Sequence, residues 1–170
     1  MGYKKRGYNR DLPGELIKDY KLFAIACEGG EREPDYFNVF QFMSNKIKVD
    51  VIECSVSDEE MKIKHKNKSA PKWVLDRAVK YIEKEGLIDD DDLWFVIDKD
   101  RWKENQLREI AQYCNEHKNW NIVISNPCFE VWLYFHKKND ACSSTSKTCR
   151  DFKKEISTFV SGGYHPHKFI

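Results

Sequence analysis

Four short apolar runs recur along the chain, separated by longer stretches in which apolar and polar residues follow a helical period. The runs cover 21–27, 49–56, 93–97 and 121–125. Each has the length of a strand, and the run at 93–97 (LWFVI) contains no polar residue. Continuous apolar runs of this length are typical of parallel strands covered on both faces. The pattern therefore predicts four buried strands.

The stretches between and after these runs predict helices. They are 34–44, 71–86, 103–117, 126–138 and about 146–160. The clearest is 71–86, because Pro71 suits a first helical turn, Gly86 suits a helix end, and the apolar residues between them form a stripe. Asn126-Pro127 predicts an N-cap followed by a first-turn proline, and the helix after it is apolar almost all round. We therefore expect that helix to be buried.

The alternation of strands and helices predicts an α/β fold with a mostly parallel central sheet of about four strands, flanked by helices in three layers. We expect a single domain over 20–170, since a chain of 170 residues is of that size. Residues 1–19 are polar and basic and contain Pro13 and Gly14, so they predict a flexible basic arm. The lysine-rich stretch 57–70 predicts an exposed loop.

Acidic residues stand where the predicted strands end. Glu28 follows the first run, Asp98 and Asp100 follow the third, and Glu130 comes soon after the fourth. The carboxyl ends of parallel strands meet at one edge of a sheet, so these side chains should converge there. Neighbouring carboxylates repel each other unless a cation lies between them, and Mg²⁺ prefers oxygen ligands. The pattern predicts a Mg²⁺ or Mn²⁺ site, to which Glu33 could also contribute.

Each of these side chains also has a structural interpretation. Carboxylates near helix N-termini, such as Glu33 and Glu130, are favoured by the helix dipole alone. Ser125 and Asn126 are polar residues at the end of the fourth run and are candidates for accessory roles. His136 shares a face with apolar residues, and a histidine in that position is usually a core residue that makes one hydrogen bond.

Composition adds little about partners but excludes several classes of protein. Apolar residues make up 41% and aromatic residues 14%, which is typical of a globular protein, and the net charge is only +1. The six cysteines show no C-x-x-C spacing, and no apolar run approaches the length of a membrane span. We therefore expect a cytoplasmic protein without a membrane association. Local basic stretches could still bind phosphates, above all Lys62, Lys64, Lys66, Lys68 and Lys72.

Three segments together resemble the RloB-like family. They are CEGGEREPDYF at 27–37, LWFVIDKDRW at 93–102 and IVISNPCFEVWLYFH at 122–136. The family shows an E-G-x-x-[S/T]-E-x-x-Y-F element, a strand that ends in D-x-D, and an S-N-P-C-F-E-x-W element. The resemblance implies a Toprim-like, Rossmann-like fold with Mg²⁺-binding chemistry and an association with phage defence or abortive infection. It also implies that Glu28 is the Toprim glutamate, and that Asp98 and Asp100 are the D-x-D pair. Glu33 and Glu130 would be further acids, and Asn126 and His136 further polar motif positions.

Three functions follow as alternatives. The first is a metal-dependent nuclease in which Glu28, Asp98 and Asp100 hold the ion, Glu33 and Glu130 hold a second ion or orient water, and the lysine-rich stretch grips nucleic acid. The second is a non-catalytic nucleic-acid-binding or sensor subunit that works with a partner ATPase. The third is a phosphatase or phosphotransferase with Asp98 as nucleophile and Ser125 as phosphate ligand.

Overall fold

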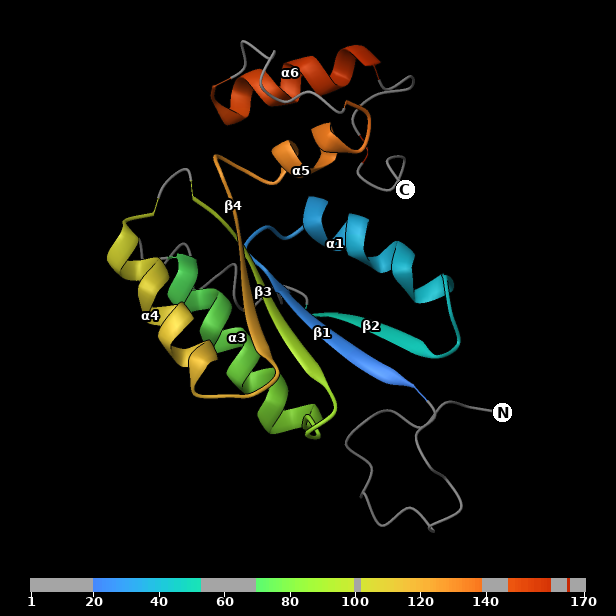
Figure 1. The fold of residues 1–170 in the computed structure, drawn as a ribbon, viewed down its shortest axis with the longest axis vertical. Helices are drawn as coiled ribbons and strands as arrows, with labels where there is room; N and C mark the ends of the chain where they lie inside the picture. Colours follow the sequence, from blue (N-terminus) through green and yellow to red (C-terminus); the bar gives the residue numbers. More distant parts are fainter. Residues whose placement is uncertain (1–19, 53–69, 100–101, 139–146, 160–164, 166–170) are drawn as a thin grey trace.

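The computed structural model describes residues 20–52, 70–99, 102–138, 147–159 and 165. The strands are β1 (Lys21–Cys27), β2 (Ile47–Ile52), β3 (Asp92–Asp98) and β4 (Trp120–Ser125). They form a single four-stranded sheet in the order β2-β1-β3-β4, and every neighbouring pair is parallel. The four apolar runs therefore are strands, as predicted, and their carboxyl ends share one edge of the sheet (Figure 1).

Helices lie on both faces of this sheet and above its carboxyl edge. On one face lie α3 (Ala70–Glu85) and α4 (Glu104–Asn115), while α1 (Arg32–Asn38) and the 3-10 helix η1 (Val39–Phe42) lie on the other (Figure 1). The short helix α5 (Glu130–Phe135) and then α6 (Cys149–Phe159) stand beyond the strand ends. This arrangement confirms the α/β class, and none of the described helices is long and apolar enough to cross a membrane.

Alternation along each strand divides the core between the two faces. On β1, Ala24 and Ala26 pack toward α3 and α4, where Phe95 and Ile97 of β3 join them. On the opposite face, buried side chains from β1, β2 and β3 pack against α1, α5 and α6. Because β1 and β3 are covered on both faces near their carboxyl ends, they have the continuous apolar sequence that identified them.

Two helices differ from the prediction. The helix expected from Pro34 begins at Arg32 and passes into η1 after Asn38. The helix expected directly after Asn126-Pro127 begins only at Glu130, and the peptide bond between Asn126 and Pro127 is cis.

The expectation that this last helix is buried holds for one side only. Leu133 and Tyr134 are buried in the core cluster on this face of the sheet, whereas Trp132 is 51% exposed and Phe135 is also exposed.

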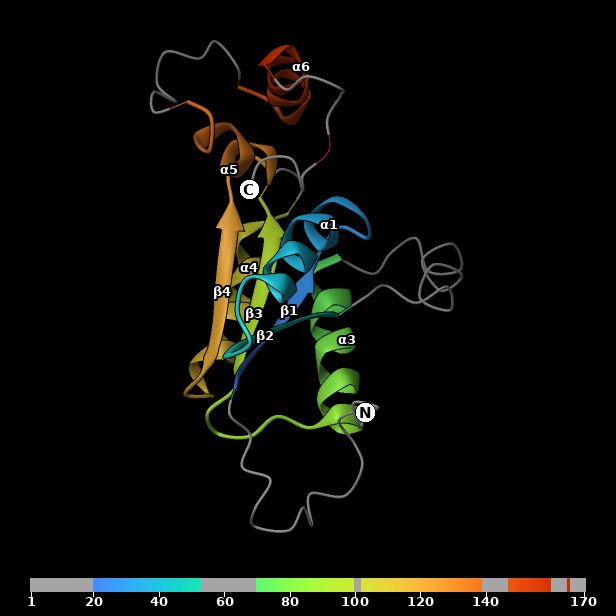
Figure 2. The same ribbon diagram turned by 90° about the vertical axis from the view of Figure 1, so that its right-hand side faces the viewer.

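The strand order fixes where a ligand would bind. The connection from β1 to β2 carries α1 over one face of the sheet. The connection from β2 to β3 carries α3 over the opposite face (Figures 1 and 2). Between β1 and β3 the order of the strands reverses, and a crevice opens outside the carboxyl ends at such a switch point. Glu28 and Asp98 stand on its two sides.

The fold predicts a large effect of truncating the central strand. Phe95 has no exposed surface, so Phe95→Ala should lower the free energy of unfolding by about 3–5 kcal/mol through lost burial and a residual cavity. Urea unfolding followed by circular dichroism measures this change. The control is Ile124→Ala on β4, whose side chain is exposed, with an expected cost below about 1 kcal/mol. Equal losses for the two variants would contradict the placement of β3 at the centre.

Candidate functional site

The ends of β1 and β3 are joined through the side chain of Glu28. Its backbone N–H donates to the carbonyl of Val96 (3.0 Å), which extends the pairing of the two strands by one residue. Its carboxylate accepts a hydrogen bond from the backbone N–H of Asp98 (3.1 Å) and another from the indole N–H of Trp102 (2.9 Å). Glu28 and Asp98 are therefore held side by side, as the parallel sheet predicted.

Glu33 brings a third carboxylate to the same place. It lies in the first turn of α1, is only 8% exposed, and packs directly on Gly29. A Cβ at position 29 would lie 2.7 Å from Cδ of Glu33 and 2.8 Å from its Oε1, so only glycine leaves room for the carboxyl group. Glu28 thus supplies one carboxylate, and Gly29 after it leaves the space for the carboxyl group of Glu33.

The charges of these carboxylates act on one another. Burial raises the pKa of Glu33, and the negative charges of Glu130 and Glu28 raise it further, against a lowering by its own backbone N–H and by Arg32. An acid with a raised pKa is held in its charged form at a cost, and a nearby cation would relieve that cost. The electrostatics agree with the expected convergence of Glu28, Glu33 and Glu130.

Glu130 differs from the other acids because it already has cationic partners. It is 3% exposed, and its Oε1 lies 3.0 Å from Nη1 of Arg32 and 3.4 Å from Nζ of Lys153. A buried carboxylate requires such compensation, and removing one partner of a buried pair is usually costly. Glu130 therefore anchors two basic side chains, which come from α1 and α6.

Three of the acids, Glu33, Asp98 and Glu130, line an open cleft of about 330 Å³ at the carboxyl edge of the sheet. Its walls are Gly29, Gly30, Glu31, Arg32, Glu33, Asp98, Phe129, Glu130 and Lys153. The cleft combines carboxylate oxygens with two cationic groups. Such a combination can bind a hard cation and a phosphate next to each other.

A divalent cation fits part of the predicted ligand set. Glu28, Glu33 and Asp98 supply hard oxygen donors, and the raised pKa of Glu33 marks a place where positive charge is favoured. Glu130, by contrast, is engaged by Arg32 and Lys153. Within the described part of the chain, no three His, Cys, Asp or Glu side chains form a ready metal-binding group. Asp100, predicted as a further ligand, lies outside the described residues.

Of the residues predicted to have accessory roles, Ser125 lies beside the acids, whereas His136 is hydrogen-bonded to Tyr36 of α1. Ser125 pairs with Asp98 in the register of β3 and β4, so it stands beside the acids, while Asn126 is exposed. Nε2 of His136 lies 2.8 Å from the hydroxyl of Tyr36, with which it forms a hydrogen bond, and that hydroxyl accepts another from the indole N–H of Trp132 (2.9 Å). The phenol keeps its own proton, which it can donate to a neutral imidazole. Burial, and then the charge of Lys137, lower the pKa of His136, which agrees with this neutral form.

Most of the predicted phosphate-binding lysines lie outside the described residues, namely Lys62, Lys64, Lys66 and Lys68. So does the basic arm 1–19. Lys72 is described and is exposed in the first turn of α3, on the face of the sheet opposite α1. It does not line the cleft, so the structure does not bring it together with the acids.

Sequence reasoning missed the cations of the cleft. Arg32 occupies the position where the first RloB-like element has a serine or threonine. This departure from the family pattern was the one sign in the sequence that position 32 has a different role. Lys153 gave no signal, because only the packing of α6 brings it to Glu130. Arg77 was also missed: it is buried on α3 and donates from Nη2 to the carbonyl of Cys27 (2.5 Å), directly before Glu28.

The thiols near the site are unsuited to nucleophilic catalysis. Burial raises the pKa of Cys128, and hydrogen bonds with Cys149 and Glu130 raise it further. Burial and the charge of Glu33 likewise raise the pKa of Cys27. Both thiols stay protonated at neutral pH, whereas the thiolate is the reactive form. The carboxylates and cations of the cleft are therefore better suited to chemistry than these thiols.

The fold and the site define a parallel α/β protein with coupled carboxylates at a topological switch point. The family model described as RloB-like protein matches residues 23–169, which is most of the chain. The protein therefore belongs to the RloB-like family, and the resemblance drawn from its motifs is confirmed. Comparisons with curated proteins and with solved structures gave no significant match.

The raised pKa of Glu33 predicts a stabilising substitution. In the folded state its charged form is disfavoured, so the free energy of unfolding should fall as the pH rises above the ordinary carboxyl value of 4.5. Glu33→Gln carries no charge there and should be more stable than the wild type at pH 7 in metal-free buffer. The two proteins should converge at a pH below 4.5.

Urea unfolding at both pH values, with EDTA present, tests this. Glu31→Gln is the matched control, since Glu31 is exposed on the same turn and its substitution should change stability little. A Glu33→Gln protein that is less stable than the wild type at pH 7 would show that the carboxylate is compensated in the folded state.

The link between Tyr36 and α5 predicts a second effect. Tyr36→Phe leaves the Trp132 donor and the His136 acceptor without their shared partner, so the free energy of unfolding should fall by about 1–3 kcal/mol. Thermal or urea unfolding measures it. Tyr113→Phe is the control, because the Tyr113 ring makes aromatic contacts and its substitution should cost less than about 0.5 kcal/mol. Equal effects would contradict the hydrogen bonds.

Proposed function

We propose that this protein is a divalent-metal-dependent nuclease that hydrolyses phosphodiester bonds in nucleic acid. The observation that carries the proposal is the placement of acids at the switch point of the sheet: Glu28 is hydrogen-bonded to the backbone of Asp98, and Asp98 and Glu33 line a cleft that also holds two cations. Carboxylates in such a place are suited to a hard cation, and cations beside them are suited to phosphate. Membership of the RloB-like family supports the same reading, together with a role in phage defence or abortive infection.

Each group in the cleft has a role in this proposal. Glu28 and Asp98, with Asp100 after them, would hold Mg²⁺ or Mn²⁺. When bound, such an ion supplies Lewis-acid polarisation of the phosphate and stabilises charge on the leaving oxygen. Glu33 is suited to accept the proton of an attacking water, because a raised carboxyl pKa lies closer to neutral pH, where a general base is most effective. Arg32 and Lys153 would orient the phosphate, and Glu130 positions both of them.

A specific observation also favours a phosphatase or phosphotransferase, with Asp98 as nucleophile. That chemistry needs a hydroxyl and a cation near the nucleophile. Ser125 pairs with Asp98 across β3 and β4, and Lys153 lines the same cleft as Asp98. The two enzymatic candidates differ in substrate, since one cuts a diester within a strand and the other removes a terminal phosphate.

Cleavage assays with Mg²⁺ or Mn²⁺ test the proposal. Purified protein should cut labelled DNA or RNA only when the metal is present, and Glu28→Gln and Asp98→Asn should reduce cleavage to background because they remove charge from the ligand oxygens. Asp90→Asn is the matched control, since Asp90 is exposed at the opposite edge of the sheet and should leave the rate unchanged.

Two results would redirect the proposal. Release of phosphate from a phosphomonoester, lost in Asp98→Asn while nucleic acid stays intact, would favour the phosphatase. Metal-independent binding of nucleic acid, with no turnover of any substrate and no effect of Asp98→Asn, would favour the non-catalytic subunit that works with a partner ATPase.

A further inference from the structure

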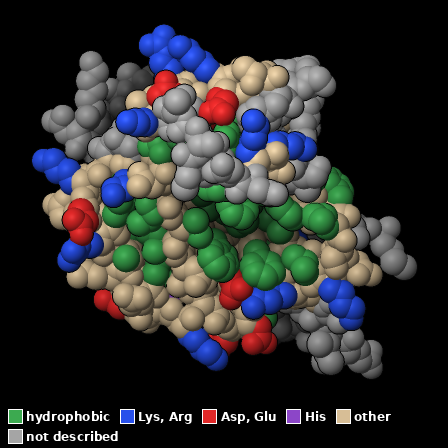
Figure 3. All heavy atoms as spheres, turned by 45° about the horizontal axis from the view of Figure 1, so that its top comes forward, with side chains coloured by type: hydrophobic (Ala, Val, Ile, Leu, Met, Phe, Trp, Pro, Cys, Tyr) green, Lys and Arg blue, Asp and Glu red, His purple; other side chains and the backbone are tan. Residues whose placement is uncertain are grey.

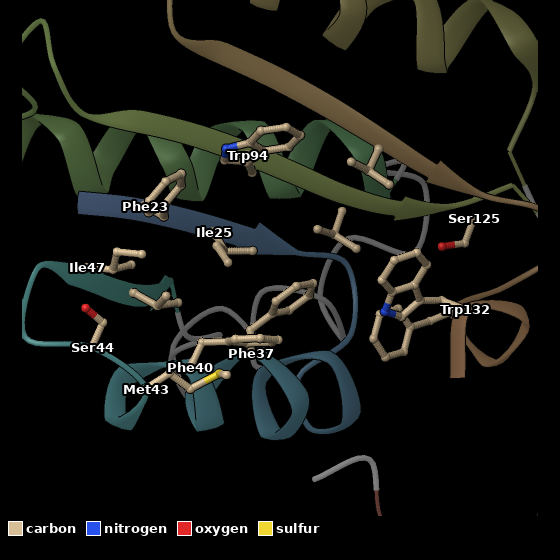
Figure 4. A pocket seen from close by; sticks show the side chains of 14 residues that line it. Phe23, Ile25, Phe37, Phe40, Met43, Ser44, Ile47, Trp94, Ser125 and Trp132 are labelled. Carbon is tan, nitrogen blue, oxygen red and sulfur yellow. The ribbon is translucent and has the colours of Figure 1, made fainter. Parts of the chain in front are cut away.

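A large apolar groove lies on the face of the sheet that carries α1. It has a volume of about 730 Å³, which is within the range of ligand pockets in proteins (roughly 300–1,000 Å³). Aromatic rings dominate its lining: Phe23 and Trp94 from the sheet, Phe37 and Phe40 from α1 and η1, and Phe129 and Trp132 near α5 (Figure 4). We call this the aromatic groove.

The described helices cover only part of this face of the sheet. The helices α1 and η1 cover β1 and β2, but no described helix lies in front of β4 (Figure 2). Val123 on β4 and Met43 after η1 consequently remain exposed although they are apolar. Figure 3 shows hydrophobic side chains gathered in a band on the surface, with basic and acidic side chains around it. Exposed apolar area of this extent usually marks a binding surface.

The aromatic groove is continuous with the acidic cleft. Phe129 lines both, and Ser125 lines the groove while its neighbour in the sheet, Asp98, lines the cleft. Arg32 and Lys153 provide positive charge at the cleft end, whereas no described lysine or arginine lines the groove. With the proposed divalent ion among the acids, a ligand that spans both would be anionic at the cleft end and flat or apolar at the other.

An unpaired nucleotide strand has this chemistry. Its phosphates carry the charge, and its bases have π-faces that stack on aromatic side chains regardless of sequence. In a duplex the same faces are occupied by neighbouring bases, so they are not available.

We propose that the aromatic groove binds unpaired nucleobases of the strand whose phosphate lies in the acidic cleft, so that single-stranded nucleic acid is the substrate. This inference rests on the proposed nuclease function and assigns its substrate class. The strand enters along the sheet face, with bases stacked between the rings of α1 and those of β1 and β3. Its backbone turns toward Arg32 and Lys153 at Phe129.

Binding measurements on the full chain test the groove separately from catalysis. Fluorescein-labelled strands of about twelve nucleotides are titrated with wild-type protein in Ca²⁺, with Mg²⁺ left out. The base-bearing strand should bind at least about tenfold more tightly than an abasic strand of equal length and charge, and more tightly than the matching duplex. A strand that contains 2-aminopurine should lose fluorescence on binding, because stacking quenches it.

Adjacent residues of β4 provide a matched pair of variants. Val123 lines the groove and is 42% exposed, whereas Ile124 points to the other face and is 41% exposed. Val123→Trp fills the groove and should abolish the difference between base-bearing and abasic strands, while Ile124→Trp should retain it. If Val123→Trp fails to fold, the abasic comparison on the wild type decides alone.

The outcomes separate the two proposals. Equal affinity for base-bearing and abasic strands overturns the groove assignment, even if Mg²⁺-dependent cleavage is found. Base-dependent binding that Val123→Trp removes supports the assignment, even if no cleavage occurs and the nuclease proposal fails. Self-association of the wild type that Val123→Trp abolishes, without any base dependence, also overturns it, because a second copy then occupies the groove.

Discussion

Repulsion between carboxylates at the end of a parallel sheet is the constraint on which the rest of this site depends. The topology leaves no choice about where Glu28 and Asp98 lie, because β1 and β3 are neighbours and both run toward the same edge. Folding must therefore compensate negative charge there. The chain does so with the backbone N–H of Asp98 and the indole N–H of Trp102 for Glu28, and with two cations for Glu130, whereas burial leaves the charge of Glu33 disfavoured.

These solutions are not equivalent, and their differences assign the roles. An acid that already has Arg32 and Lys153 as partners gains little from a metal ion, since its charge is compensated. An acid whose pKa is raised by burial and by its neighbours gains a great deal. Glu33 and Glu130 look alike in the sequence, as acids in the first turns of two helices, yet one is suited to a proton or a cation and the other to holding basic groups in place.

The sequence was sufficient for the strands and for the pairing of Glu28 with Asp98, because both follow from local patterns. A continuous apolar run indicates a strand that is buried on both faces. The carboxyl ends of neighbouring parallel strands lie at the same edge of the sheet. The start of α5 and the position of Lys153 could not be predicted in this way. They depend on how α5 and α6 pack beyond the sheet, and the contact of Lys153 with Glu130 joins segments whose local sequences are independent of each other. Arg32 was accessible in principle, as a departure from the family motif.

The unusual placement of α5 connects the site to the groove. A helix that followed β4 and folded back along the sheet would have covered Val123 and Trp94. Instead α5 stays at the carboxyl edge, where Tyr36 binds both Trp132 and His136 and so fastens α5 to α1. This leaves Glu130 over the cleft and Val123 of β4 exposed beside the groove. In the described part of the chain this arrangement sets an apolar groove next to a charged cleft, and the strand proposed as substrate, which alternates flat bases with phosphates, would match both parts at once.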